Sequence, residues 1–302
     1  MKVYLNDPIA PSAVERLKAR VELVDNYDHP EELDAIIVRQ QYCPREVIAR
    51  AEKCKLIQQH GTGLDRIDVQ AAEEYGIPVK KTTGMNARSV AEYTVAMMLD
   101  LSRKVSWIDG MTRQGALTHF GMPETVGAEV TGKTLGLVGS GSIAREVAQI
   151  AKDGFHMTVC CCNPHRSGNE LQQMGFQPVA ELKTLFRTCD YVSVHCLLTQ
   201  ETYHLIDAEV LSDCNPGLIL LNTARGGLID EAALYEALAG GKLRAAGLDV
   251  FEEQPPSVDN PLLSLPNLLA GMHVAGSTDE ALERNGKAVV DAVFEALGIE
   301  EG

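Results

Sequence analysis

The chain has 302 residues, of which 45% are hydrophobic and 23% are charged. This composition is typical of a globular protein with about two domains. The 27 Lys and Arg against 42 Asp and Glu give a formal charge of −15, which repels phosphate backbones, so nucleic acid is not expected as a partner. A carboxylate substrate stays compatible with this charge, because local cations and backbone N–H groups can hold one.

The sequence predicts a cytoplasmic protein without a membrane partner. Its first residues lack an apolar stretch of signal-peptide length, and no later segment approaches about 18 uninterrupted apolar residues. Of the eight cysteines, three form the run Cys160-Cys161-Cys162, and none shows the Cys-x-x-Cys spacing of a zinc or redox site. We interpret them as reduced structural thiols and expect no metal site.

Short apolar, β-branched runs alternate with helical patterns along the chain. The runs are 2–5, 35–38, 56–59, 134–138, 158–162, 191–194, 218–221 and 245–249. Because parallel strands need a helical crossover, this alternation predicts an α/β fold with two doubly wound parallel sheets. Between the two series, residues 86–113 suit one long, mostly buried helix with Asn86 as its cap. A Gly/Pro/Thr-rich excursion follows at 115–132, and the last helical pattern, 279–297, could return to either domain.

A glycine-rich loop follows the expected strand at 134–138. Gly139-Ser140-Gly141 and Ala144 form Gly-x-Gly-x-x-Ala, followed by a helical pattern. Gly139 permits the tight turn, Gly141 lets backbone approach a pyrophosphate, and Ala144 allows close helix packing. Flanked by strand and helix, this motif predicts that the larger domain is a Rossmann dinucleotide-binding domain.

The next strand ends at Asn163, where NAD-binding proteins usually place a carboxylate on the ribose 2′-hydroxyl. A carboxylate would repel a 2′-phosphate, whereas neutral Asn163 does not, and His165 and Arg166 follow within reach of one. The sequence therefore favours NADP over NAD, although Arg166 could instead be a solvated loop residue and Asn163 could bind either ribose.

Six motifs in order resemble the D-isomer-specific 2-hydroxyacid dehydrogenase family. They are GTGLDRID (61–68), NARSVAE (86–92), the glycine-rich loop, NTARGG (222–227), GLDVF (247–251) and HVAGST (273–278). The resemblance implies a discontinuous substrate-binding domain of residues 1–97 with 278–302, a dinucleotide-binding domain of residues 98–277, and an active site between them. It also implies a homodimer formed through the dinucleotide-binding domains and a segment at about 99–131.

Reduction of a 2-oxo acid needs an anchor for the carboxylate, a cation beside the carbonyl oxygen and an acid that protonates this oxygen. The resemblance gives the first two roles to Arg225, whose fork of donors suits a carboxylate, and the third to His273. Backbone N–H groups around Thr62 and Gly63 are expected to meet the carboxylate as well, and His60 is a candidate for lining the substrate pocket.

The same resemblance implies further contacts to the cofactor. Asp249 corresponds to the residue that contacts the nicotinamide carboxamide, although an acidic residue that ends a strand could merely cap backbone donors. His195 begins a family-like turn near the cofactor. The other candidate cofactor-binding residues are Ser142, Ile143, Thr202, Thr223 and Gly276.

One position departs from the family pattern. Most members carry a Glu directly before the proline of the 251–255 loop, where it hydrogen-bonds the catalytic His, but this chain has Gln254. Gln254 can orient the imidazole without the negative charge that favours its protonated form. We therefore expect His273 to titrate near or below about 6.5. Glu252 or Glu253 could instead supply the carboxylate through a different loop path, or be solvated surface charges.

These residues predict an NADP(H)-preferring or NAD(H)-using enzyme that transfers hydride between the cofactor and a small 2-oxo acid or D-2-hydroxy acid. Two alternatives stay open. One is a phosphoglycerate dehydrogenase-like activity on phosphorylated substrates. The other is a nucleotide-gated binding module, similar to the C-terminal binding protein corepressors, that recruits partners without turnover.

Overall fold

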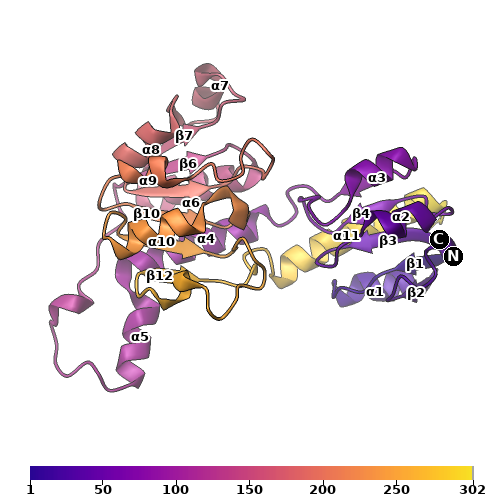
Figure 1. Cartoon of the computed structure of the whole chain (residues 1–302), viewed down its shortest axis with the longest axis horizontal. Helices are drawn as coiled ribbons and strands as arrows, with labels where there is room; N and C mark the ends of the chain where they lie inside the picture. The colour runs from indigo at the N-terminus through magenta and orange to yellow at the C-terminus, as the bar shows by residue number, and fades with distance from the viewer. Residues whose placement is uncertain (301–302) are drawn as a thin grey trace. The chain divides into compact units, whose positions relative to one another are not determined.

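The computed structural model describes residues 1–300, and Figure 1 labels its elements. The strands are β1 (Lys2–Tyr4), β2 (Glu22–Val24), β3 (Leu33–Val38), β4 (Ile57–Gln59), β5 (Val79–Lys81), β6 (Thr134–Val138), β7 (Thr158–Cys162), β8 (Gln177–Pro178), β9 (Tyr191–Val194), β10 (Ile219–Asn222), β11 (Ala245–Leu248) and β12 (Leu268–Ala270). The helices are α1 (Pro11–Lys18), α2 (Arg45–Arg50), α3 (Val69–Glu74), α4 (Ala87–Arg103), α5 (Val105–Arg113), α6 (Ser142–Phe155), α7 (Gly168–Gln173), α8 (Leu182–Thr188), α9 (Ala208–Ser212), α10 (Glu231–Ala239) and α11 (Asp279–Leu297). Short 3-10 turns lie at Pro30–Glu32, Pro123–Thr125, Gly226–Leu228 and Pro261–Ser264.

The chain forms two compact units. Unit 1 comprises Met1–Asn86 together with the segment from Ser277 onward, and unit 2 comprises Ala87–Gly276. The first division lies before α4 rather than at the expected 97/98. The reason is that α4 packs along its length against α6, β10 and β11 of unit 2.

Unit 1 is built on a parallel sheet with the strand order β2-β1-β3-β4-β5. Helices cover both faces, because α1 and α11 enclose one apolar cluster and α2 and α3 enclose another. Helix α11 returns to this unit and packs closely on α1, where a Cβ at Gly286 would lie 2.9 Å from the Cβ of Ala13. A hydrogen bond of 2.6 Å from Thr82 Oγ1 to Asn285 Oδ1 joins α11 to the end of β5.

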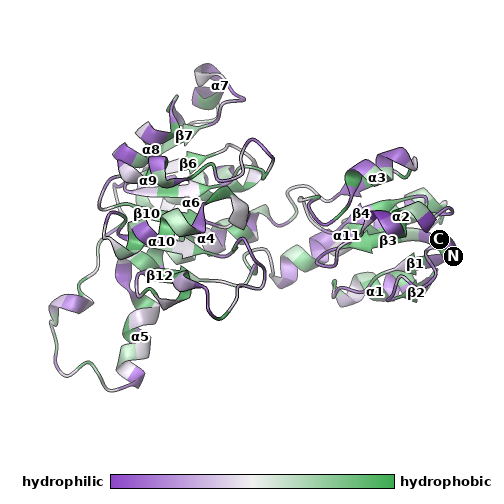
Figure 2. Ribbon diagram, in the orientation of Figure 1, coloured by the Kyte–Doolittle hydropathy of each residue, from purple (hydrophilic) through white to green (hydrophobic). Residues whose placement is uncertain are grey.

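Unit 2 has a parallel sheet with the order β12-β11-β10-β9-β6-β7-β8. Its two faces bury separate hydrophobic clusters, and Figure 2 shows hydrophobic residues concentrated in the strands. Cys160 and Cys162 belong to one cluster and Cys161 to the other, as strand alternation predicts. The predicted α/β fold with two doubly wound parallel sheets is confirmed. No helix among residues 1–300 combines the length and apolar character that crossing a membrane requires.

The expected single helix at 86–113 is two helices. Lys104 adopts the left-handed conformation, with φ of 58°, between α4 and α5. The Asp100 carboxylate then accepts hydrogen bonds from the backbone N–H and the hydroxyl of Ser106, at 2.7 and 2.6 Å. It thereby binds donors that the start of α5 leaves unpaired, which explains why the break is stable.

Candidate active site

The candidate residues of unit 2 follow the carboxyl ends of its strands. The glycine-rich loop follows β6, Asn163 follows β7 and His195 follows β9, while Arg225, Asp249 and His273 come after β10, β11 and β12. Because the strands are parallel and adjacent, all these residues lie along one edge of the sheet. Ligands of doubly wound folds bind at this edge, where the strand order reverses.

The glycine-rich loop has the geometry that a dinucleotide pyrophosphate requires. Gly139 has φ of +100°, and a Cβ there would lie 2.8 Å from the carbonyl oxygen of His195. The space above Gly141 is open, and no side chain among residues 1–300 caps the N-terminus of α6, which begins with Ser142 and Ile143. Uncapped N–H groups beside open space suit a phosphate, so these residues fit the cofactor.

Asn163 is tied to the glycine-rich loop. Its amide donates to Ser140 Oγ at 2.8 Å, and its Oδ1 accepts from the backbone N–H of His165 at 3.0 Å. His165 and Arg166 are exposed. Arg166 lies 3.7 Å from Glu170, an exposed ion pair that contributes little to stability and leaves the guanidinium available for exchange.

Three other candidate side chains are bound within unit 2. Ser193 Oγ lies 2.9 Å from Nε2 of His195, and burial lowers the pKa of this imidazole to about 4. The hydroxyl of Thr202 closes its own turn through the carbonyl of Leu197 at 2.6 Å. Thr223 Oγ1 is buried 3.0 Å from Thr94 Oγ1 of α4. These side chains belong to the edge formed by the carboxyl ends of the unit 2 strands. Gly276, another candidate, is the last residue of unit 2.

Asp249 holds the segment that carries His273. Its two carboxylate oxygens accept from the backbone N–H groups of Val274 and Ala275, at 3.0 and 2.8 Å, and its carbonyl accepts from that of His273 at 2.6 Å. Burial raises the pKa of Asp249, and the three backbone hydrogen bonds oppose this shift. Asp249 therefore caps backbone donors, and its contact with the nicotinamide carboxamide stays a prediction.

His273 and Gln254 are brought together. The Oε1 atom of Gln254 lies 2.8 Å from Nδ1 of His273, and its amide donates to the carbonyl of Phe251 at 3.1 Å. His273 has φ of 54°, a left-handed conformation that is costly for a residue with a Cβ. When Gln254 accepts from Nδ1–H, Nε2 is the acceptor nitrogen of the neutral imidazole.

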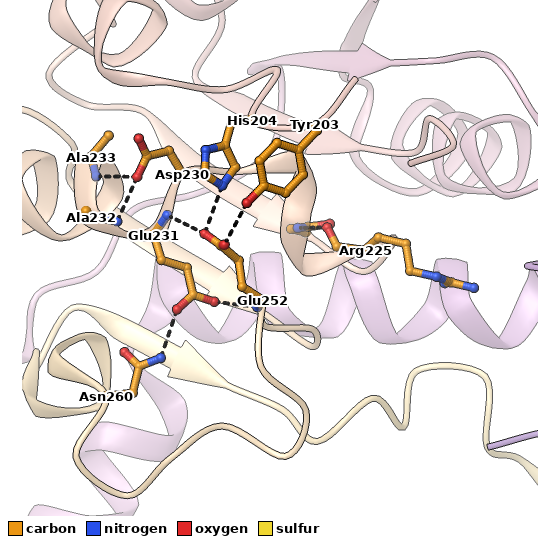
Figure 3. Close-up of polar contacts among 10 residues, drawn as sticks. Tyr203, His204, Arg225, Asp230, Glu231, Ala232, Ala233, Glu252 and Asn260 are labelled. Carbon is orange, nitrogen blue, oxygen red and sulfur yellow. Dashed lines mark hydrogen bonds and ion pairs between the residues drawn. The ribbon is translucent and has the colours of Figure 1, made fainter. Parts of the chain in front are cut away.

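Glu252, which the sequence left as a possible partner of His273, lies elsewhere. Its carboxylate is bound by His204 Nε2 at 3.1 Å, by the backbone N–H of Glu231 at 3.2 Å and by the Tyr203 hydroxyl at 3.4 Å. Figure 3 shows these contacts, with the Arg225 side chain extending away from them. Glu252 is therefore neither the partner of His273 nor a freely solvated charge.

Arg225 follows β10 in a turn that Asn222 fixes. The Asn222 side chain accepts from the N–H of Ala224 at 3.0 Å and donates to the carbonyl of Arg225 at 2.9 Å. The guanidinium donates to the carbonyl of Ala224 at 2.7 Å. The turn thus has a defined backbone before any ligand binds.

The candidate substrate residues His60, Thr62 and Gly63 belong to unit 1, at the end of β4. The Thr62 hydroxyl donates to the carbonyl of Thr82 at 3.3 Å. His60 is 7% exposed, and its buried Nε2 has no hydrogen-bond partner within the described chain. Burial, together with the charge of Arg39, lowers the pKa of His60 to about 4, so its imidazole is neutral at pH 7.

Two polar side chains of α4, Tyr93 and Thr94, were not among the site residues expected from the sequence. Thr94 is buried against Thr223, and a Cβ at Gly271 would lie 2.8 Å from the Tyr93 hydroxyl and 2.3 Å from the Asp249 carboxylate. Burial, and then the charge of Asp249, raise the pKa of Tyr93. The signal in the sequence was a polar pair inside an otherwise apolar helical pattern.

Comparison with known proteins identifies the family of this chain. Residues 95–275 match the family model of the D-isomer specific 2-hydroxyacid dehydrogenase NAD binding domain. The chain is 38% identical to a hydroxypyruvate reductase from Thermotoga maritima, with 99% of each chain covered. It is 37% identical to a D-3-phosphoglycerate dehydrogenase from Methanocaldococcus jannaschii over 98% of its own length, but it spans only 57% of that relative.

A solved structure is also similar over nearly the whole chain. An NADPH-dependent glyoxylate/hydroxypyruvate reductase from Sinorhizobium meliloti, in complex with NADP and malonate, superposes with a TM-score of 0.85 at 28% identity, covering 96% of this chain and 91% of that one. The chain therefore belongs to the D-isomer-specific 2-hydroxyacid dehydrogenase family, and the resemblance inferred from the six motifs is confirmed. It is an NAD(P)-dependent oxidoreductase with a Rossmann domain.

Proposed function

We propose that this protein reduces a small 2-oxo acid, such as glyoxylate or hydroxypyruvate, with NAD(P)H, and catalyses the reverse oxidation of the D-2-hydroxy acid. The observation that carries this proposal is the pairing of His273 Nδ1 with Gln254 Oε1 at 2.8 Å. This contact fixes the orientation of the imidazole, and we assign its Nε2 to the substrate oxygen.

In the proposed reaction, Arg225 binds the substrate carboxylate and polarises the carbonyl. The protonated His273 gives its Nε2 proton to the carbonyl oxygen while Gln254 holds Nδ1. The reduced nicotinamide, when bound, supplies the hydride. Backbone N–H groups at Thr62 and Gly63 add to the carboxylate site, and His60 lines the pocket as a neutral imidazole. Unit 1 is accordingly the substrate-binding domain in this proposal, and unit 2 the dinucleotide-binding domain.

We also propose that NADP is the preferred cofactor. Asn163 brings no negative charge to the end of β7, and the exposed His165 and Arg166 are free to turn toward a 2′-phosphate. The glycine-rich loop, with Ser142 and Ile143, would hold the pyrophosphate of the cofactor. His195, Thr202, Thr223, Asp249 and Gly276 line the remaining part of the site.

The proposed assembly is a homodimer that works in the cytoplasm. Helix α5 has no buried residue, and the segment after it exposes Phe120 completely and Val126 to 65%. Figure 1 shows α5 and this segment projecting from the rest of unit 2. Apolar surface of this kind is suited to association with a second copy. The free thiols of all eight cysteines fit a reducing compartment.

A turnover assay over a panel of 2-oxo acids with NADPH and NADH tests the proposal. We expect reduction of small unphosphorylated acids, with a higher kcat/KM for NADPH. Preference for phosphorylated substrates would instead favour the phosphoglycerate dehydrogenase-like alternative. Cofactor binding without turnover of any acid would refute the proposed reductase activity and favour a nucleotide-gated binding module.

A further inference from the structure

Glu252 lies at the centre of a polar cluster whose role the proposed reaction leaves open. Three donors bind its carboxylate: His204 Nε2, the Tyr203 hydroxyl and the backbone N–H of Glu231. The side chains of His204 and Glu252 are 30% and 32% exposed, so solvent only partly screens their contact. Figure 3 shows these contacts converging on one carboxylate from two different segments of the chain.

The backbone of Glu252 is held as firmly as its side chain. Its N–H donates to Glu231 Oε1 at 2.7 Å, while the N–H of Glu231 donates back to Glu252 Oε1. Asn260 then binds the second oxygen of Glu231 at 2.8 Å. Glu231 is the first residue of α10, so this exchange fastens the loop after β11 to a helix N-terminus that favours negative charge.

The peptide that Glu252 fixes touches the turn of Arg225. A Cβ added to Gly226 would lie 1.9 Å from the backbone carbon of Phe251 and 2.4 Å from the nitrogen of Glu252. Only glycine therefore fits, and the two backbones lie in direct contact. A shift of the 251–252 peptide would move the turn next to Arg225.

The same peptide supports Gln254. The carbonyl of Phe251 accepts a hydrogen bond from the Gln254 side-chain amide at 3.1 Å, and the Oε1 atom of the same amide contacts Nδ1 of His273. His204 completes the arrangement, because its backbone N–H donates to the carbonyl of Gly227 at 2.8 Å. One peptide thus borders both the carboxylate anchor and the partner of the proposed acid.

We propose that Glu252 is a positioning residue for the reaction. By binding His204, Tyr203 and the N–H of Glu231, its carboxylate fixes the 251–252 peptide, which in turn sets Arg225 on one side and Gln254 with His273 on the other. This inference rests on the proposed function for its kinetic consequences. Its structural part, the fastening of the loop, is measurable without turnover.

The kinetic test compares Glu252→Ala with Glu253→Ala. Glu253 is the matched control, because it removes the same charge from the next position and makes no hydrogen bond or ion pair in the described chain. We expect Glu252→Ala to lower kcat about tenfold and to raise KM for the 2-oxo acid about fivefold, since small displacements of reacting groups are costly. The Kd of the cofactor should stay within about twofold, and Glu253→Ala should match wild type.

Glu252→Gln tests whether the negative charge of Glu252 is needed. The amide keeps an oxygen for His204 and for the N–H of Glu231 but loses the charge, so we expect it to restore most of the kcat lost in Glu252→Ala. Hydrogen exchange of peptides covering 226–231 and 251–255 should be faster in Glu252→Ala than in Glu253→Ala. A purely local stabilising role would change exchange or melting without changing the KM for the 2-oxo acid.

Equal kinetics and equal exchange in the two alanine variants would overturn the proposal. If Glu252→Ala does not fold, His204→Ala removes one donor only and should give the same changes at about a third of their size. If the wild type turns over no 2-oxo acid, the proposed function fails. The exchange comparison then still decides whether Glu252 fastens the loop, and equal exchange would refute it.

Discussion

The two sheets differ in how many polar groups near the carboxyl ends of their strands have hydrogen-bond partners. In unit 2, Asp249, Gln254 and Glu252 each bind defined partners. Gln254 contacts the His273 side chain and Asp249 binds the backbone of its segment, where His273 adopts a left-handed conformation. In unit 1, the buried atoms Gln58 Oε1, Gln59 Oε1 and His60 Nε2 have no hydrogen-bond partner within the described chain.

This difference separates two tasks. Contacts within unit 2 fix the groups proposed for catalysis, as preorganised donors and acids require. Unit 1 keeps buried polar atoms unpaired, which costs stability and suits recognition of a ligand. We therefore expect substitutions in unit 2 to change the rate of the chemical step, and substitutions in unit 1 to change stability and choice of substrate.

The largest expected effect is on catalysis through unit 2. His273→Asn keeps a residue that tolerates the left-handed conformation but removes the imidazole. We expect kcat for 2-oxo acid reduction to fall by about 10²–10⁴, because this is what a general acid contributes. Cofactor Kd, measured by fluorescence titration, should change little. A kcat within about threefold of wild type would show that another group is the acid.

The next effect concerns stability in unit 1. Because the pKa of His60 is lowered to about 4 in the folded chain, the unfolded chain binds the proton more tightly. The contribution of the neutral His60 imidazole to the free energy of unfolding is complete above about pH 6.5 and is lost as the pH falls toward 4. At pH 4.5 the loss amounts to roughly 2–3 kcal/mol.

Urea unfolding at pH 7 and pH 4.5 checks this expectation. His60→Leu should lose less stability between these pH values than wild type does. The control is His29→Leu, at an exposed position, which should behave like wild type. An identical acid sensitivity in His60→Leu and wild type would contradict the buried neutral imidazole.

A smaller change is expected from Gln254→Glu. The new carboxylate beside Nδ1 should favour the protonated imidazole, so the fall in reduction rate at high pH should move upward by about one unit. Glu253→Gln changes the charge of the same loop away from His273 and should leave the profile in place. An unshifted profile in Gln254→Glu would mean that Gln254 does not influence the acid.

The smallest expected effect is on the cofactor. Arg166→Ala should raise KM for NADPH about fivefold and leave KM for NADH unchanged, a difference of roughly 1 kcal/mol for an exposed charge pair. Arg187→Ala, another exposed arginine of unit 2 with an ion pair to Asp213, is the matched control. Equal changes for both cofactors would argue against a 2′-phosphate contact.

The sequence predicted the inner strands and missed the outer ones. All four strands absent from the expected series, β2, β5, β8 and β12, lie at sheet edges. Edge strands are buried on fewer sides and need no continuous apolar run, and β5 and β8 read Val-Lys-Lys and Gln-Pro. The break at Lys104 was also hidden, because it depends on the Asp100 side chain reaching Ser106.

The amino-acid sequence by itself determined the alternation that folds into two parallel sheets, the glycine-rich loop and the motifs that define the family. These features depend on local spacing, which a linear pattern records. The tertiary structure decided which carboxylate binds which donor. Glu252, Glu253 and Gln254 are neighbours in sequence, yet only the path of their loop brings Gln254 into contact with His273 and Glu252 into contact with His204. Such pairings depend on contacts between distant segments, and residue spacing does not encode them.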